Sequence, residues 1–325
     1  MAQIRLDVKD MRMLDELDRN ANIISSQLAK KAGISRQVAE YRINKLCSQK
    51  TIYAFHTLVD VGRLGYSSFR VHIRLKNVSE DVYFNFAKEL FSDYPTFWVA
   101  FVSGKFDLIA DIFARNSNEF EEMFSGVLQK NKDIIQSYET LVILEMDLYS
   151  YGYFLQEKIE RSKVAMHRNI EAIKIDKVDR QILHVIKNNS RLTYSTIGHK
   201  IGLTRNAVKN RILKLEERNI ILGYKAFINF RHFDKQSFKI FIKYNTSKME
   251  QEKALLNYLR NRDGVLATLK ILGRWNLDIE IHVRYAKELQ QFVMDLRNRY
   301  EIIEDYEFVQ IIEDYGIDFY PNKLM

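Results

Sequence analysis

Two stretches of the sequence decide the fold, GISRQVAEYRINKL at residues 33–46 and GLTRNAVKNRILKL at residues 202–215. Each begins with a glycine, the residue that most easily adopts the left-handed backbone of a tight turn. A hydroxyl residue, Ser35 or Thr204, follows two positions later and is a favoured N-cap for a helix. Because a short helical stretch also precedes each turn, the pattern predicts a helix-turn-helix in both places.

The outward face of each capped helix carries side chains suited to reading DNA. Apolar residues at helical spacing form the opposite, inward faces: Ala39, Ile43 and Leu46 in the first copy, and Val208, Ile212 and Leu215 in the second. The outward faces carry Gln37, Tyr41 and Asn44, and Asn206, Asn210 and Leu213. Asn and Gln can form paired hydrogen bonds with adenine, and neighbouring cations can neutralise phosphates. The predicted DNA-binding residues are Ser35, Arg36, Gln37, Tyr41, Arg42, Asn44, Lys45, Thr204, Arg205, Asn206, Lys209, Asn210, Arg211 and Lys214. A merely solvated helix face is the alternative interpretation.

The two stretches belong to an internal duplication with an offset of 169 residues. Between Leu6 and Phe55, 13 of 50 positions are identical to their counterparts, with no gap in the alignment. Both copies place an aspartate, Asp7 or Asp176, where it can cap the first helix. Since the same offset relates Gly104 to Gly273, the duplication covers nearly the whole chain.

The back of each copy has the pattern of a mixed α/β domain. In the first copy, strands are expected at 69–75, 96–102, 108–114 and 134–148, with helices at 81–91 and 117–130. The second copy repeats the order at 238–244, 248–260, 265–272, 275–283, 286–300 and 302–313. This β-α-β-β-α-β order is ferredoxin-like. One face of such a sheet is left apolar, so we expect it to pair with another sheet, either in the other copy or in another chain.

The predicted fold class is therefore α+β, with two tandem units of a winged-helix or helix-turn-helix domain followed by a ferredoxin-like domain. The expected boundaries are a first helix-turn-helix domain at 1–60 and a first ferredoxin-like domain at 61–154, serving ligand sensing or oligomerisation. A charged stretch without Gly or Pro, 155–169, is predicted to be a helical linker. The second helix-turn-helix and ferredoxin-like domains are expected at 170–229 and 230–325.

Composition narrows the class of protein. With 46% hydrophobic and 28% charged residues, the chain is an ordinary folded protein and not a disordered one. Its longest apolar run, 97–102, is too short to span a membrane, and the N-terminus has no apolar signal core. A single cysteine, Cys47, excludes an internal disulfide framework and a cysteine-based zinc site. We therefore expect a cytoplasmic protein.

The net charge of +8 is concentrated in particular segments of the chain. Residues 170–229 contain 12 Lys and Arg against 5 Asp and Glu, whereas residues 1–60 contain 10 against 7. The second helix-turn-helix is thus predicted to be the stronger electrostatic anchor on a nucleic acid.

These features together resemble the Lrp/AsnC (feast/famine) family of transcription regulators. The resemblance rests on the capped helix-turn-helix followed by the β-α-β-β-α-β domain, and on a hairpin motif that reads Gly104-Lys105-Phe106-Asp107 here and Gly273-Arg274-Trp275-Asn276 in the second copy. Family members normally carry one such unit, so this chain resembles a covalently fused dimer.

The resemblance implies a sequence-specific DNA-binding regulator that is not an enzyme. Its partners would be double-stranded DNA and a small effector such as an amino acid, with no membrane, in a homo-oligomer or an intrachain pseudo-dimer. The family's effector pocket lies near the hairpin, which points to Gly104, Asp107, Gly273 and Asn276. Asn276 replaces the expected carboxylate, and a simple tight turn is the alternative role for all four. No cofactor and no metal are expected.

Two alternatives stay open from the sequence. Sirohaem decarboxylases are similar to these regulators in fold and are often built from two units. Such enzymes need basic and histidine side chains around an acidic tetrapyrrole, yet none of the seven histidines recurs at the 169-residue offset. The second alternative is an effector-binding or assembly module that no longer reads DNA, which the intact caps and basic flanks disfavour.

Overall fold

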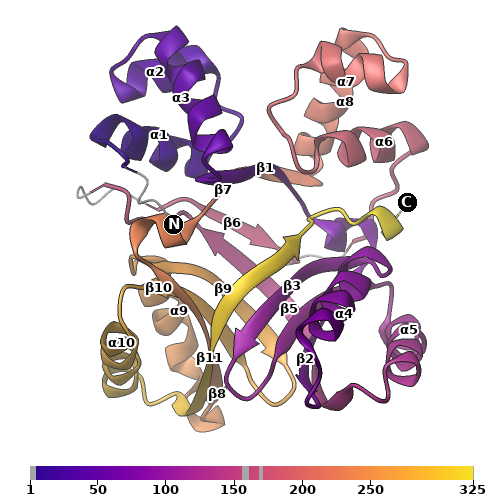
Figure 1. Cartoon of the computed structure of the whole chain (residues 1–325), viewed down its shortest axis with the longest axis vertical. Coiled ribbons are helices and arrows are strands. Elements are labelled where there is room, and N and C mark those ends of the chain that lie inside the picture. Colours follow the sequence, from indigo (N-terminus) through magenta and orange to yellow (C-terminus); the bar gives the residue numbers. More distant parts are fainter. Residues whose placement is uncertain (1–4, 156–160, 168–170, 325) are drawn as a thin grey trace.

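The computed structural model describes residues 5–155, 161–167 and 171–324. Each copy begins with a helical head, as predicted. The first head consists of α1 (Val8–Arg19), α2 (Ser25–Ala32) and α3 (Arg36–Ser48), and the second of α6 (Lys177–Ile186), α7 (Tyr194–Ile201) and α8 (Arg205–Glu217). Figure 1 shows both heads on the same side of the molecule, above the strands.

The sequence determines the ends of these helices through the expected caps. Gly33 and Gly202 end α2 and α7 in the left-handed conformation, with φ of 65° and 73°. The side chains of Ser35 and Thr204 then accept hydrogen bonds from the backbone of α3 and α8. The predicted inward faces of both helices are buried, which confirms the helical register.

The back of each copy has the ferredoxin-like order. In the first copy it comprises η1 (Val61–Leu64), β2 (Ser67–Leu75), α4 (Glu80–Ser92), β3 (Thr96–Ser103), β4 (Leu108–Ala114), α5 (Ser117–Lys130) and β5 (Ile135–Tyr149). In the second copy it comprises η2 (Phe230–Phe233), β8 (Gln236–Tyr244), η3 (Thr246–Gln251), α9 (Glu252–Arg260), β9 (Val265–Leu272), β10 (Leu277–Val283), α10 (Ala286–Arg299) and β11 (Ile303–Ile317), followed by η4 (Asn322–Leu324). The third strand of the second copy begins two residues later than predicted.

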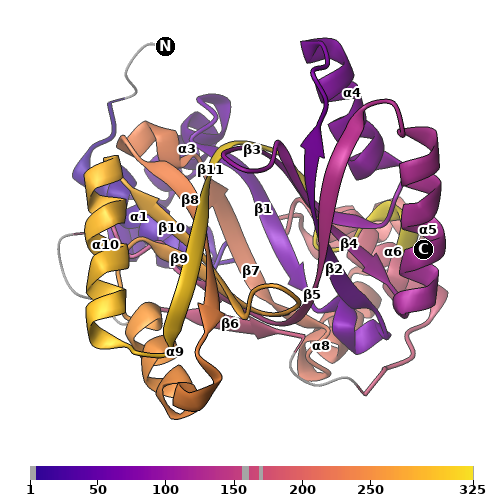
Figure 2. The same ribbon diagram turned by 90° about the horizontal axis from the view of Figure 1, so that it is seen from below.

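The two sheets join into a closed ring within the chain. Strand β5 pairs with β2 through its first part and with β9 of the other copy through its second part. Strand β11 likewise pairs with β8 and then with β3. The strands therefore run β2-β4-β3-β11-β8-β10-β9-β5, and β5 returns to β2. Figure 2 shows the strands at the centre, with α5 and α10 on opposite outer sides. The apolar faces are thus covered by the other half of the same chain.

A two-stranded wing links the heads to this ring. Strand β1 (Ile52–Val59) pairs antiparallel with β7 (Ile221–Ile228), so each copy contributes one strand. Each head then rests on the wing strand of the other copy. Ala21 donates its backbone N–H to Tyr224 at 2.9 Å, and Ser190 donates to Phe55 at 2.8 Å. The wing strands had no prediction of their own from the sequence.

The predicted helical linker is wrong where the structure describes it. Lys163–Met166 forms strand β6, which pairs antiparallel with Met146–Tyr149 at the end of β5. Backbone pairing with an available strand here outweighs the helix-forming composition. Residues 156–160 and 168–170 of that stretch lie outside the described residues. Across the described part of the chain, every helix is too short or too polar to cross a bilayer.

Candidate DNA interface and ligand chamber

The predicted reading faces of α3 and α8 are exposed. Gln37, Tyr41 and Asn44 lie on the surface of α3, and 68% of Tyr41 is exposed. On α8, Asn206, Asn210 and Leu213 are exposed in the corresponding region. The structure therefore presents both predicted triplets to solvent, on heads that lie on one side of the molecule (Figure 1).

The cations beside the two reading faces differ between the heads. On α8, Arg205, Lys209 and Lys214 are exposed and form no ion pair with any described residue. On α3, Lys45 is exposed, but Arg36 forms a salt bridge with Glu40 at 2.9 Å. Three cations on α8 without ion pairs among the described residues agree with the higher charge of the second head.

Two of the predicted DNA-binding arginines form salt bridges within their own heads. Arg42 donates to the carboxylates of Asp7 and Asp10 at 2.8 and 2.7 Å. Arg211 does the same with Asp176 and Asp179, both at 2.7 Å. These aspartates form the capping boxes of α1 and α6. Each arginine thus joins the recognition helix to the first helix of its head, a role that a sequence without contacts does not reveal.

The predicted effector residues hold the ends of two hairpins. The Asp107 carboxylate accepts the backbone N–H of Leu75 at 2.8 Å. Asn276 repeats the contact in the second copy, where its amide oxygen accepts the N–H of Tyr244 at 2.8 Å. An amide oxygen serves this purpose as well as a carboxylate, which explains how Asn can replace Asp. The hairpin side chains are therefore engaged in holding turns.

The two hairpins lie close to each other, because Lys105 and Arg274 pair with the same carboxylate. Gly104 and Gly273 have φ of 139° and 145°, and their Cα atoms face the long strand of the opposite copy. An added Cβ would come within 3.2 Å of Val309 in the first case and 2.5 Å of Leu141 in the second. Lys105 and Arg274 beside these glycines pair with Glu139 at 2.5 and 2.9 Å. The hairpin motif thus forms part of the contact between copies.

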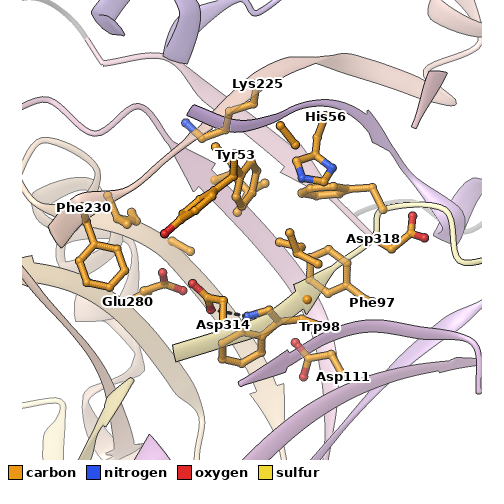
Figure 3. A pocket seen from close by; sticks show the side chains of 18 of the residues that line it. Tyr53, His56, Phe97, Trp98, Asp111, Lys225, Phe230, Glu280, Asp314 and Asp318 are labelled. Atoms are coloured by element: carbon orange, nitrogen blue, oxygen red, sulfur yellow. Dashed lines mark hydrogen bonds between the residues drawn. The ribbon is translucent and has the colours of Figure 1, made fainter. Parts of the chain in front are cut away.

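A larger cavity lies between the wing and the ring of strands. Its volume is about 620 Å³, within the range of small-molecule sites. Both copies line it, and the lining includes charged groups and many aromatic rings (Figure 3). We call this cavity the chamber. No sequence pattern predicted it, because its walls come from residues that are up to about 270 positions apart and that meet only when the ring closes.

A buried ion network forms one wall of the chamber. Arg70 donates to both oxygens of Asp111 at 2.6 Å and also pairs with Asp278. Lys239, the counterpart of Arg70 in the second copy, pairs with Glu280 at 2.9 Å. Burial raises the pKa of Glu280, but Lys239 beside it holds that pKa below its usual value. In the sequence, this network is marked by charged residues, such as Arg70 and Lys239, within otherwise apolar strands.

Next to this network, Asp314 carries an unusual carboxylate. Trp98 donates its indole N–H to Asp314 at 2.8 Å, as Figure 3 shows. Desolvation of the carboxylate by the surrounding protein and the nearby negative charge of Glu280 raise the pKa of Asp314 to about 6. The chamber histidines change in the opposite direction, because burial lowers the pKa of His56 to about 4 and that of His282 to about 3. Both histidines are therefore neutral at pH 7.

Comparisons with known proteins agree on the heads. A model of the AsnC-type helix-turn-helix domain matches residues 175–216, and a model of winged helix-turn-helix DNA-binding domains matches residues 6–52. The chain is 34% identical over 136 residues to an uncharacterized HTH-type transcriptional regulator of Pyrococcus abyssi, covering 39% of this chain and 82% of that protein. It is 29% identical to the HTH-type transcriptional regulator Ptr1 of Methanocaldococcus jannaschii, covering 31% and 68%.

A solved structure matches the two-unit architecture as a whole. The crystal structure of the siroheme decarboxylase NirDL superposes with a TM-score of 0.64 over 96% of this chain and 93% of that chain. The sequences are 12% identical over this match. At that identity, the likeness establishes the shared fold and carries no argument about activity.

Proposed function

This chain belongs to the Lrp/AsnC family of transcription regulators, and from that premise we propose that it reads an asymmetric DNA site with two unlike heads. The observation that carries the proposal is the exposure of two capped recognition helices, on one side of the molecule, with different reading faces. A homodimer of identical units prefers a palindrome, whereas this pair presents Gln37, Tyr41 and Asn44 beside Asn206, Asn210 and Leu213. The half-sites are expected about one helical turn apart, or a multiple of it.

The two heads have different shares in binding. The second head supplies most of the phosphate contacts through Arg205, Lys209 and Lys214, since these cations are free of ion pairs with described residues. The first head contributes base contacts and fewer phosphate contacts, because Arg36 is paired with Glu40. The linkage of both heads in one chain should make DNA affinity less dependent on protein concentration.

Selection of bound duplexes from a random pool, followed by affinity measurements across a salt series, tests the proposal. We expect an asymmetric enriched motif and a steep decline of affinity with salt. Asn210→Ala should relax base preference at one half-site, with Asn257→Ala on α9 as the matched control. Lys209→Ala should weaken binding to all sequences and flatten the salt slope, whereas Lys253→Ala should not. A palindromic motif, or no binding at low salt, would contradict the proposal.

The hairpin residues Gly104, Asp107, Gly273 and Asn276 remain our predicted effector site in the family's position. Because these side chains also hold the turns, a test of ligand contact needs a substitution that preserves the turn hydrogen bond. Asp107→Asn preserves the acceptor for Leu75 but removes the charge that an ammonium group needs. Calorimetric titration with amino acids should show weaker binding to this variant. Equal binding would leave the hairpins with a structural role.

The enzyme alternative draws on one observation, the fold shared with a siroheme decarboxylase over nearly the whole chain. The chamber disfavours an acidic tetrapyrrole electrostatically. Its cations Arg70 and Lys239 are already paired with carboxylates, and both chamber histidines are neutral. We therefore propose a regulator without enzymatic activity. An absorption titration with sirohaem should show no saturable spectral change, and a change with product formation would overturn this assignment.

A further inference from the structure

The chamber lies where a bound molecule would touch both the wing and the ring. Tyr53 and Phe227 come from the two wing strands, and Trp98 and Asp314 come from strands of the ring. Because the heads rest on the wing strands, anything that fixes the wing against the ring also fixes the heads. The chamber is thus placed to connect a ligand with the recognition helices.

The charge left uncompensated in the chamber is negative. Three basic groups in the wall are neutralised by carboxylates: Arg70 by Asp111 and Asp278, Lys239 by Glu280, and Lys225 by Asp18. The fourth, Arg231, donates to the neutral carbonyl of Ile312, and its charge is outweighed by Asp314 and Glu313, which form no ion pair with described residues. Asp314, by contrast, accepts one neutral hydrogen bond from Trp98 and forms no ion pair with a described residue. Its side chain is exposed to the open space of the chamber.

A second carboxylate reinforces this negative potential. Glu280 lies close enough to Asp314 to disfavour its ionised form, and Figure 3 labels both carboxylates in the chamber wall. A cation beside Asp314 would favour its ionised form and offset the repulsion from Glu280. No group of three or more His, Cys, Asp or Glu side chains able to hold a metal ion occurs among the described residues. The complement to this pair is therefore an organic cation.

The remaining walls suit the body of such a molecule. They are rich in aromatic rings, which attract cations over their faces and provide apolar surface. Trp98 already has the guanidinium of Arg70 at 5.4 Å and the ammonium of Lys239 at 5.0 Å from its ring centre. The aromatic lining residues include Tyr53, Phe97, Trp98, Phe227, Phe230 and Phe319.

We propose that the chamber binds an organic ammonium compound with an apolar body, its ammonium group held by Asp314 and its body packed among the aromatic rings. The site differs from the hairpin site in position and in charge. The binding stands by itself, whereas its consequence for the setting of the heads rests on the proposed DNA-binding function.

The proposal also fixes the stoichiometry. Asp314 lies opposite Ala100 in the pairing of β11 with β3, and the equivalent position of β5, opposite Leu269, is Met146. The carboxylate that distinguishes the site therefore occurs once in the chain, although the fold is duplicated. We expect one molecule of ligand per chain.

The pH dependence of binding follows from the groups that face Asp314. These are Glu280 from β10, Lys239 from β8, Arg231 from η2, Tyr53 from β1 and Tyr151 after β5. The two tyrosines stay neutral between pH 5 and pH 7.5, because burial raises the pKa of Tyr53 and Tyr151 above the ordinary value of 10. Asp314 is protonated as the pH falls below about 6, so binding of a cation should weaken there.

Calorimetry on the full chain without DNA tests the site. The probes are two amines, tryptamine and 4-phenylbutylamine, with indole-3-propionate and 5-phenylvalerate as carboxylates of similar shape, and L-tryptophan as an amino acid. We expect at least one amine to bind with a stoichiometry of one, at least tenfold more tightly than its carboxylate counterpart or L-tryptophan, and to lose about tenfold in affinity between pH 7.5 and pH 5.

The matched variants separate the site from the rest of the surface. Asp314→Asn keeps an acceptor for Trp98 and should lower amine affinity at least tenfold, whereas Asp305→Asn on the same strand should leave it unchanged. Failure of both amines to bind, preference for a carboxylate or for L-tryptophan, or full affinity in Asp314→Asn would overturn the proposal. Since DNA is absent, none of these outcomes depends on whether the heads read DNA.

Discussion

Lys225 on the wing strand of the second copy forms a buried ion pair with Asp18 at the end of α1 in the first copy. The same ammonium group donates to the carbonyl of Tyr149 at 3.1 Å. Burial raises the pKa of Asp18, and the charge of Lys225 opposes that change. The first head is thus tied to the second half through a charge pair that solvent barely reaches.

Lys225→Met should therefore destabilise the protein strongly. It leaves the Asp18 carboxylate, whose side chain is fully buried, without its counter-charge, and breaking a buried pair costs about 3–5 kcal/mol. Chemical denaturation measures the loss. The control is Lys243→Met, which breaks an exposed pair with Glu304 and should cost less than about 1 kcal/mol. Similar losses in both variants would show that the Asp18 pair has no special role.

Arg211 and Lys209 lie two residues apart on α8 but should respond differently to substitution. Arg211→Ala removes the tie to the capping box of α6, so we expect a loss of about 1 kcal/mol in head stability, small because the arginine is partly exposed. Lys209→Ala should leave stability unchanged and weaken DNA binding. Thermal unfolding together with the salt dependence of DNA affinity distinguishes the two roles. A flattened salt slope in Arg211→Ala with unchanged stability would return Arg211 to the DNA contacts.

Stability should fall in mild acid because of His56. Its folded-state pKa of about 4 lies below the ordinary value of 6.5, so the unfolded chain binds the proton first. The stability that the neutral imidazole ring of His56 contributes is therefore fully present above pH 6.5. As the pH falls from 6.5 toward 4, the free energy of unfolding decreases by about 1.4 kcal/mol per pH unit. Denaturant unfolding at several pH values should show a shallower acid slope in His56→Gln, and the unaltered slope in His199→Gln, an exposed control. Equal slopes in all three proteins would contradict this assignment.

Replacing two different glycines with alanine should change the stability of the protein in opposite directions. Gly273→Ala places a Cβ 2.5 Å from Leu141 at a φ of 145°, so it strains the hairpin and pushes the copies apart. Gly126→Ala lies on the exposed side of α5 with nothing within 4 Å and should stabilise by about 0.5–1 kcal/mol. Melting temperatures test both. Tolerance of Gly273→Ala would mean that the hairpin does not pack against the opposite strand as described.

The sequence predicted the elements whose information is local. Strand 108–114, helix 117–130 and strand 265–272 have the expected bounds, because each has its own periodic pattern and a turn at its end. The wing strands have no such pattern, and β1 becomes a strand through its pairing with β7, whose residues lie 169 positions away. Pairing with the end of β5 likewise turned part of the predicted linker helix into β6.

The DNA interface could be predicted only in part from the sequence, for a similar reason. Helical angles sufficed to place Asn206 and Asn210 on an exposed face, as the structure shows. They did not reveal that Asp176 lies within reach of Arg211, because that contact joins two helices. Nothing in the sequence indicated the chamber, since Trp98 and Asp314 meet only after β3 has paired with β11, the last strand of the ring.

The closed ring has a consequence for synthesis on the ribosome. Strand β3 finds its second neighbour in β11, the last strand of the chain, and the end of β5 finds its own in β9. At a translation rate of 5–20 residues per second, the edge of β3 waits on the order of ten seconds or more for that partner. During this interval, the nascent first half exposes open strand edges to its neighbours on the same messenger. Cells should therefore need chaperones most while residues 150–317 are being made, and slowing translation in that window should lower the soluble yield.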